Sequence, residues 1–134
     1  MVGMDGRAKL TDFGLSCLLD EAEIQIEVKK MGVVHWKSPE YLAGGRPSCA
    51  SNAYSFAMCI IEIVSGEIPW DKSILLPMIR YKVKKGSIPP LPKLMNEKQR
   101  NLIQLMTKQD PGERMRMAFV VDKLSEIAQD AMTP

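Results

Sequence analysis

The stretch that most constrains the fold is the run from Ser51 to Ser65, which reads SNAYSFAMCIIEIVS. Ser51-Asn52 at its start favours a helix N-cap, and Gly66 after it favours a helix end. Apolar residues occur on every side of the predicted helix, and a helix that is apolar all round is normally a buried one. A chain of 134 residues can form one domain with a single core. We therefore predict that this helix is central and that the other elements pack around it.

Proline, glycine and capping residues predict four further helices around it. The expected ranges are 38–44, 77–86, 96–109 and a last helix that starts near Met115 and repeats apolar residues at helical spacing. Near the N-terminus, the Asp5-Gly6 turn signal precedes the alternating segment RAKLT, which predicts a short β-hairpin. The predicted fold class is therefore mainly α.

Composition excludes several functional classes. The net charge of +2 gives no electrostatic argument for a nucleic-acid or membrane partner. The longest apolar run, residues 56–61, is far shorter than the ~20 residues of a membrane-spanning helix. The three cysteines form no CxxC pair and only one histidine accompanies them, so no zinc site is expected. An odd number of cysteines without a signal peptide favours reduced thiols and a cytoplasmic location.

Four short motifs follow one another along the chain: TDFGLS, WKSPEYL, SNAYSFAMCIIEIVSGEIPW and DPGERMR. Asp12 in the first motif lies at a predicted strand end, where its carboxylate could bind a hard cation such as Mg²⁺. Alone, that motif is weak, because an aspartate at a strand end is usually a turn former. In this order and spacing, however, the four motifs resemble the C-terminal lobe of a protein kinase, closest to the tyrosine-kinase-like serine/threonine group. The resemblance extends from Asp5 to about Ala131.

The resemblance implies a partial kinase domain over residues 1–134, with helices EF, F, G, H and I of the C-terminal lobe and an activation segment at 12–40. Asp12 would be the Mg²⁺ ligand on ATP, and Phe13 and Gly14 complete its motif. Ser16 is the only hydroxyl residue between Asp12 and Trp36, which makes it the candidate phosphosite. The acidic residues after it could imitate a phosphate, but a solvated acidic loop is the preferred interpretation.

The resemblance also assigns roles to residues of the helical part. Ser38, Pro39 and Glu40 correspond to the Ala-Pro-Glu motif, and Arg114 would pair with Glu40 in a buried ion pair. Asn52 replaces the aspartate that begins helix F in the family, and it could still cap a helix. The substrate-docking loop would contain His35, Trp36 and Lys37.

The sequence departs from the family at the motifs that catalysis requires. A His-Arg-Asp motif is expected before Asp12, but the preceding segment MVGMDGRAKLT contains none. The N-terminal lobe, with its phosphate-pairing lysine and glycine-rich loop, is missing as well. Phosphoryl transfer depends on positioning and electrostatics. We therefore expect this chain, taken alone, to be inactive and not to bind the ATP and Mg²⁺ that the intact family uses.

Three interpretations remain open. The chain is the truncated C-terminal lobe of a protein kinase, a non-catalytic pseudokinase-like remnant, or a product without function. In either of the first two cases, a protein substrate or partner would dock on the activation segment and on the helix-G segment MIRYKVKKG. Because a covering helix of the family lies outside this sequence, we also predict an exposed apolar face of the order of hundreds of Å² on the central helix.

Overall fold

The computed structural model describes residues 1–11 and 34–133. These two ranges belong to separate compact units, and each is considered by itself. The predicted metal ligand Asp12, its motif partners Phe13 and Gly14, and the candidate phosphosite Ser16 lie outside the described residues.

The N-terminal unit contains one isolated antiparallel bridge, between Val2 and Ala8. The turn between them uses Gly6, whose φ of 73° is in the left-handed region. Within residues 1–11 no strand forms, so the prediction of a β-hairpin was wrong. The physical reason is exposure: Val2 and Leu10 are 71% and 89% exposed, and a ribbon without a packed apolar face is marginal.

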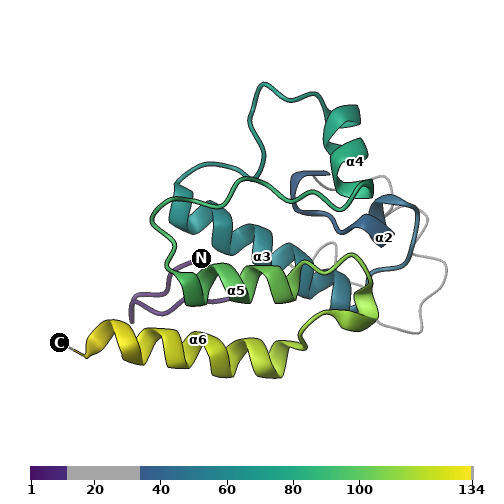
Figure 1. Ribbon diagram of the computed structural model, residues 1–134. Helices are drawn as coiled ribbons and strands as arrows, with labels where there is room; N and C mark the ends of the chain where they lie inside the picture. The colour runs from purple at the N-terminus through teal and green to yellow at the C-terminus, as the bar shows by residue number, and fades with distance from the viewer. Residues whose placement is uncertain (12–33, 134) are drawn as a thin grey trace. The chain divides into compact units, whose positions relative to one another are not determined.

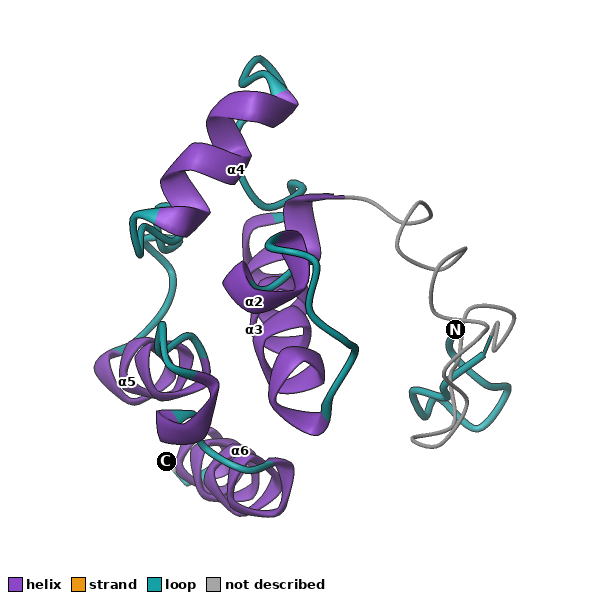
Figure 2. Ribbon diagram, turned by 90° about the vertical axis from the view of Figure 1, so that its right-hand side faces the viewer, coloured by secondary structure: helices purple, strands orange, loops and turns teal. Residues whose placement is uncertain are grey.

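Helices form the second unit, which confirms the mainly α fold class (Figures 1 and 2). Helix α5 lies between α3 and α6, while α4 packs against the segment that contains η2 and α2 (Figure 1). The elements are η2 (Val34–Trp36), α2 (Pro39–Leu42), α3 (Cys49–Ser65), α4 (Leu76–Lys84), α5 (Glu97–Met106), η3 (Pro111–Glu113) and α6 (Met117–Met132).

Capping explains where the central helix α3 begins and ends. It starts at Cys49, two residues before the predicted cap, because Ser48 is the N-cap. The Ser48 hydroxyl accepts from the Ser51 backbone N–H at 3.1 Å, and the Ser51 hydroxyl accepts from the Ser48 N–H at 2.8 Å. This capping box satisfies two backbone donors at the helix start. At the other end, Gly66 adopts a φ of 72° and ends the helix as predicted.

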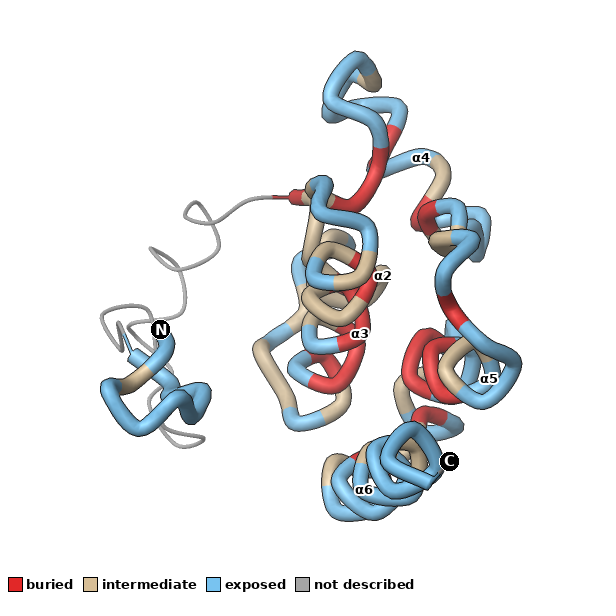
Figure 3. Tube along the Cα trace, turned by 90° about the vertical axis from the view of Figure 1, so that its left-hand side faces the viewer, coloured by how far each residue is buried: buried red, intermediate tan, exposed pale blue. Residues whose placement is uncertain are grey.

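Two apolar clusters hold the helices together. The larger one joins the inward sides of α3 and α5, which face each other in Figure 3, and adds Met95 from just before α5 and Val120 from α6. Its buried members are Tyr54, Ala57, Met58, Ile61, Met95, Leu102, Ile103, Met106 and Val120. The smaller one fixes α4 to η2 and consists of Val34, Trp70, Ile79 and Val83.

Helix α3 is central, but it is not buried on every side. Phe56 is 36% exposed and Ile63 is 77% exposed, while Asn52 is exposed near the helix start. The main contacts of α3 within residues 34–133 are with η2, α5 and η3, and these leave one side open. The predicted uncovered apolar face of hundreds of Å² stays a prediction, and Phe56 and Ile63 are the exposed apolar residues of α3 that could contribute to it.

Two isoleucines on α3 test this arrangement with the same substitution. Ile61→Ala should lower the free energy of unfolding by about 2–4 kcal/mol, because it opens a cavity at a position that is 2% exposed. Ile63→Ala should change it by less than about 0.5 kcal/mol, because that side chain is mostly in solvent. Urea unfolding followed by circular dichroism measures both. Equal losses at the two positions would contradict the burial described above.

Candidate functional site

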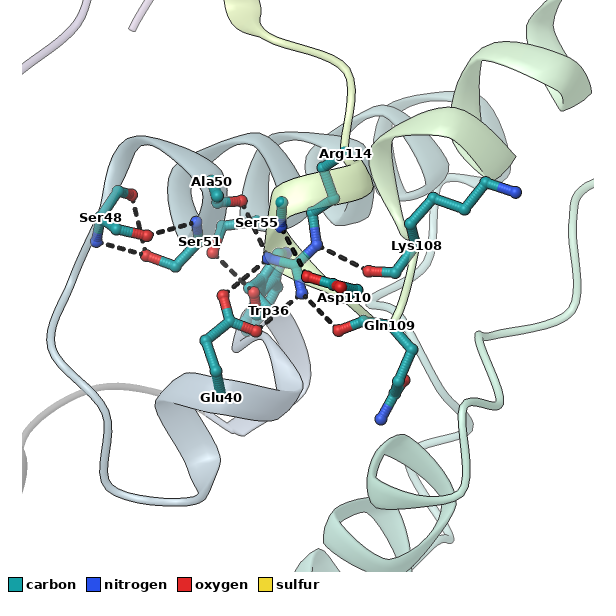
Figure 4. Close-up of polar contacts among 11 residues, drawn as sticks. Trp36, Glu40, Ser48, Ala50, Ser51, Ser55, Lys108, Gln109, Asp110 and Arg114 are labelled. Atoms are coloured by element: carbon teal, nitrogen blue, oxygen red, sulfur yellow. Dashed lines mark hydrogen bonds and ion pairs between the residues drawn. The ribbon is translucent and has the colours of Figure 1, made fainter.

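The best-defined polar centre of the helical unit is the guanidinium of Arg114 (Figure 4). It makes a two-pronged contact with the Glu40 carboxylate, from Nη1 to Oε1 at 2.6 Å and from Nη2 to Oε2 at 2.7 Å. The remaining N–H groups donate to backbone carbonyls of Lys108 at 2.7 Å, Ala50 at 3.0 Å and Gln109 at 3.3 Å. A guanidinium has five N–H donors, so every one of them has a partner here.

Three local structures place this ion pair. Glu40 lies in the first turn of α2, whose start is set by Pro39 at the first helical position. Arg114 directly follows η3, where the Asp110 carboxylate accepts from the Gly112 N–H at 2.8 Å. The Tyr54 ring of α3 lies under the guanidinium, with 5.2 Å from Cζ to the ring centroid, a cation–π distance. The predicted pair between Glu40 and Arg114 is therefore present and joins α2, α3 and the α5–α6 connection.

Burial and charge act in opposite directions on the Glu40 carboxyl. Its side chain is 25% exposed, whereas that of Arg114 is 0% exposed. Burial raises the pKa of Glu40, but the Arg114 hydrogen bonds, a backbone hydrogen bond and the Arg114 charge outweigh it, so the pKa lies below its ordinary value. Burial also raises the pKa of Tyr54 to about 12, so its ring remains neutral under the cation.

Trp36, predicted for the substrate-docking loop, is fastened to α3 at two points. Its indole Nε1–H donates to Glu62 Oε2 at 2.9 Å, and its carbonyl accepts from Ser55 Oγ at 2.7 Å. The His35 ring lies beside it, with 5.7 Å between centroids, and His35 Nδ1 is buried without a hydrogen-bond partner in the described part of the chain. Sequence reasoning missed Ser55 and Glu62, because both interrupt an otherwise apolar helix and no spacing marks them as anchors.

The residues between η2 and α2 complete this segment. Lys37 Nζ lies 4.2 Å from the centroid of the Tyr41 ring, and burial lowers the pKa of Lys37. Ser38 is fully buried, and its hydroxyl has no hydrogen-bond partner among the described residues. The alanine of the family motif would place no polar atom there, whereas this hydroxyl lies close enough to the Glu40 carboxyl to help lower its pKa.

Asn52 does not have the capping role that its position suggested. It is the fourth residue of α3, and the cap is Ser48. Its exposed side chain lines a groove of about 510 Å³ together with Cys49, Met115 and Arg116. Among the described residues, the Asn52 side chain makes no hydrogen bond.

Within residues 1–11 and 34–133 there is no group of three or more histidine, cysteine, aspartate or glutamate side chains that could hold a metal ion. The predicted ligand Asp12 lies outside these ranges. The contacts of Trp36 and Glu40 hold residues 34–42 in one conformation against α3 and the α5–α6 connection. No helix in the described ranges has the length and apolar character needed to cross a membrane.

The lowered pKa of Glu40 predicts acid-sensitive stability. In the unfolded chain this carboxyl has its ordinary pKa of 4.5, so the unfolded state binds the proton more readily than the folded state. The Glu40 contribution is therefore fully present above that value and is lost as the pH falls through the lower pKa of the folded state. We expect Glu40→Gln to flatten the fall in unfolding free energy between about pH 5 and about pH 3.

Urea unfolding at several pH values measures this slope. Glu97→Gln removes an exposed charge from the first turn of α5 and controls for the change in net charge. If Glu40→Gln and Glu97→Gln keep the same slope as the unchanged protein, the folded state does not hold the Glu40 carboxylate as described.

Comparison with known proteins gives a consistent result. A family model described as "Protein tyrosine and serine/threonine kinase" matches residues 1–124. The probable serine/threonine-protein kinase mkcC of Dictyostelium discoideum is 31% identical over 85% of this chain and 12% of its own length. Serine/threonine-protein kinase PknA of Mycobacterium tuberculosis is 32% identical over 83% of this chain and 26% of its own length.

The Bacillus subtilis serine/threonine-protein kinase PrkC is 26% identical over 90% of this chain and 20% of its own length. The chain thus spans only between about one eighth and one quarter of these relatives. With the family model covering most of the sequence and the helices in the predicted order, the chain belongs to the protein kinase family, of whose domain it forms a C-terminal-lobe fragment.

Proposed function

We propose that this chain is the substrate-holding part of an ATP-dependent serine/threonine protein kinase. The proposal rests mainly on Arg114, which donates five hydrogen bonds, two of them to Glu40. These bonds hold Glu40 in place, and with it the segment that would receive a protein substrate. The serine/threonine kinases among the relatives support the choice of hydroxyl acceptor.

The mechanism of this part is positioning. Phosphoryl transfer gains most of its rate from holding the reacting groups in place and from stabilising charge. Residues 34–42 are held at two places, by Trp36 on α3 and by Glu40 on Arg114, and within the segment Lys37 lies over the Tyr41 ring. A peptide lying along this segment would meet a surface fixed at both of these places. By its motif, Asp12 would hold Mg²⁺ on ATP in a whole kinase domain, and Ser16 would be a phosphorylation site.

The chain alone should not transfer phosphate. Its 134 residues contain no His-Arg-Asp motif, so the base that accepts the substrate hydroxyl proton is not among them. A fragment with one candidate metal ligand should also bind Mg²⁺ and ATP too weakly to matter, since Mg²⁺ needs several oxygen ligands. We place the activity in the cytoplasm, on the basis of the cysteine pattern described above.

A second function, a non-catalytic pseudokinase-like interaction module, is favoured by one surface. Helix α4 leaves Met78 and Tyr81 50% and 57% exposed, which suits a protein contact. In both cases the partner would be a protein that docks on the activation segment and α4.

A chimeric kinase separates the two functions. Residues 5–131 of this chain would replace the corresponding part of the PrkC kinase domain, so that the N-terminal lobe and catalytic loop come from that relative. We expect serine or threonine phosphorylation of a generic protein substrate, reduced by about a thousandfold or more in Asp12→Ala. The unmodified 134-residue chain should incorporate no phosphate.

Asp5→Ala, which changes an exposed aspartate of the N-terminal turn, is the matched control and should keep the activity. A chimera that folds and binds ATP but phosphorylates nothing would favour the interaction module. Activity that survives Asp12→Ala would contradict the metal role of that residue.

A further inference from the structure

The charges of this chain are unevenly distributed. Between Asp71 and Glu97 the sequence contains no acidic residue, although the chain has 16 in total. The same interval carries six of the 18 basic residues: Lys72, Arg80, Lys82, Lys84, Lys85 and Lys93. The near-neutral total of +2 therefore conceals a cationic segment, and α4 (Leu76–Lys84) lies inside it.

Helix α4 is attached to the protein along one narrow side. Only Ile79 and Val83 are buried, one helical turn apart, where they pack with Val34 and Trp70. The rest of the helix is turned to solvent, including four large apolar side chains, three at the start of the helix and one in its second half. These are Leu75 (75% exposed), Leu76 (48%), Met78 (50%) and Tyr81 (57%).

The positive charge lies on α4 from its middle residue, Arg80, onward and on the residue after the helix. Arg80, Lys84 and Lys85 are exposed, and Lys82 is half-buried with its Nζ 5.9 Å from the centroid of the Trp70 ring. Among the described residues, none of these four cations makes an ion pair with a carboxylate. Favourable interaction with the helix dipole accounts for lysines in the last turn. It does not account for the exposed apolar residues one or two turns earlier.

We propose that α4 binds an acidic protein segment that also carries large apolar side chains. The binding surface, here called the α4 surface, consists of Leu75, Leu76, Met78, Arg80, Tyr81, Lys84 and Lys85. The inference rests on the proposed role of α4 as a partner-binding element and adds the chemistry of the partner. Apolar side chains of the partner would cover the first half of α4, and carboxylates would pair with the cations of the second half.

The arrangement favours a protein segment over a lipid surface. A helix that lies in a membrane interface separates its apolar and charged residues on opposite faces along its whole length. On α4 the fully apolar side, Ile79 and Val83, is already used for packing. The exposed apolar groups instead concentrate toward the start of the helix and the cations toward its end, and Arg80 adjoins Tyr81 in the middle. A chain with successive apolar and acidic residues complements this order, and opposite charge supplies specificity and rate of association.

The test measures peptide binding without ATP. The 134-residue protein is titrated into a fluorescein-labelled peptide in which leucines adjoin a run of glutamates, and fluorescence anisotropy gives the dissociation constant. A peptide with glutamine in place of every glutamate is the control. We expect saturable binding of the acidic peptide, at least about tenfold weaker for the glutamine peptide, and weakening with added salt.

Variants locate the binding surface. Arg80→Glu with Lys84→Glu should weaken binding by about tenfold or more, and Met78→Ser with Tyr81→Ser should also weaken it. Arg46→Glu with Arg7→Glu makes the same change in net charge at exposed positions outside α4 and should leave binding unchanged. If the charge reversal impairs folding, judged by thermal unfolding, Arg80→Gln with Lys84→Gln replaces it and should weaken binding in the same direction.

The proposal is overturned if the glutamine peptide binds equally well or if the α4 variants bind like the unchanged protein. It is also overturned if vesicles containing phosphatidylserine bind through α4 while the acidic peptide does not, because the partner would then be a membrane. Since no ATP is present, failure of peptide binding would leave the proposed phosphoryl transfer untouched. An inactive chimeric kinase would in turn leave the binding result standing.

Discussion

The helical unit depends on one buried cation. The Arg114 guanidinium is enclosed by a carboxylate, three backbone carbonyls and the Tyr54 ring, and none of its N–H groups is left without a partner. A buried charge is costly when it loses its partner, so the surrounding backbone is constrained to keep these groups in place. In this way one side chain ties the short helix α2, the start of α3 and the turn before α6 to one another.

The segment that would receive a substrate takes its conformation from this constraint and from α3. Trp36 is bonded to α3 through Ser55 and Glu62, and Glu40 holds the other end of the segment on Arg114. Apolar packing supplies the support, because α3, α5 and α6 share one cluster and α4 is fixed to η2 by another. A short segment with little burial of its own is thus held by polar contacts to rigid helices, as positioning of a protein substrate requires.

Structural features that depend on neighbouring residues could be predicted from the sequence better than features that depend on residues far apart in it. Pro39, Gly66 and Gly86 act through the local backbone, and the helix ends that they set lie at or near the predicted positions. The start of α3 was missed because the Ser48 and Ser51 hydroxyls bond to each other's backbone, and either serine alone looks like a cap. The pair between Glu40 and Arg114 is separated by 74 positions, so only family resemblance could suggest it. The open side of α3 depends on what packs against it, which its composition cannot reveal.

The most direct test of this account is a double-mutant cycle between Glu40 and Arg114. Glu40→Gln, Arg114→Met and the double variant are compared with the unchanged protein by urea unfolding. Arg114→Met should lower the free energy of unfolding by about 3 kcal/mol. This loss is toward the low end for buried ion pairs because Glu40 is 25% exposed. We expect a coupling energy above about 1 kcal/mol between the two sites. Losses that add without coupling would show that the segment is held by something other than this ion pair.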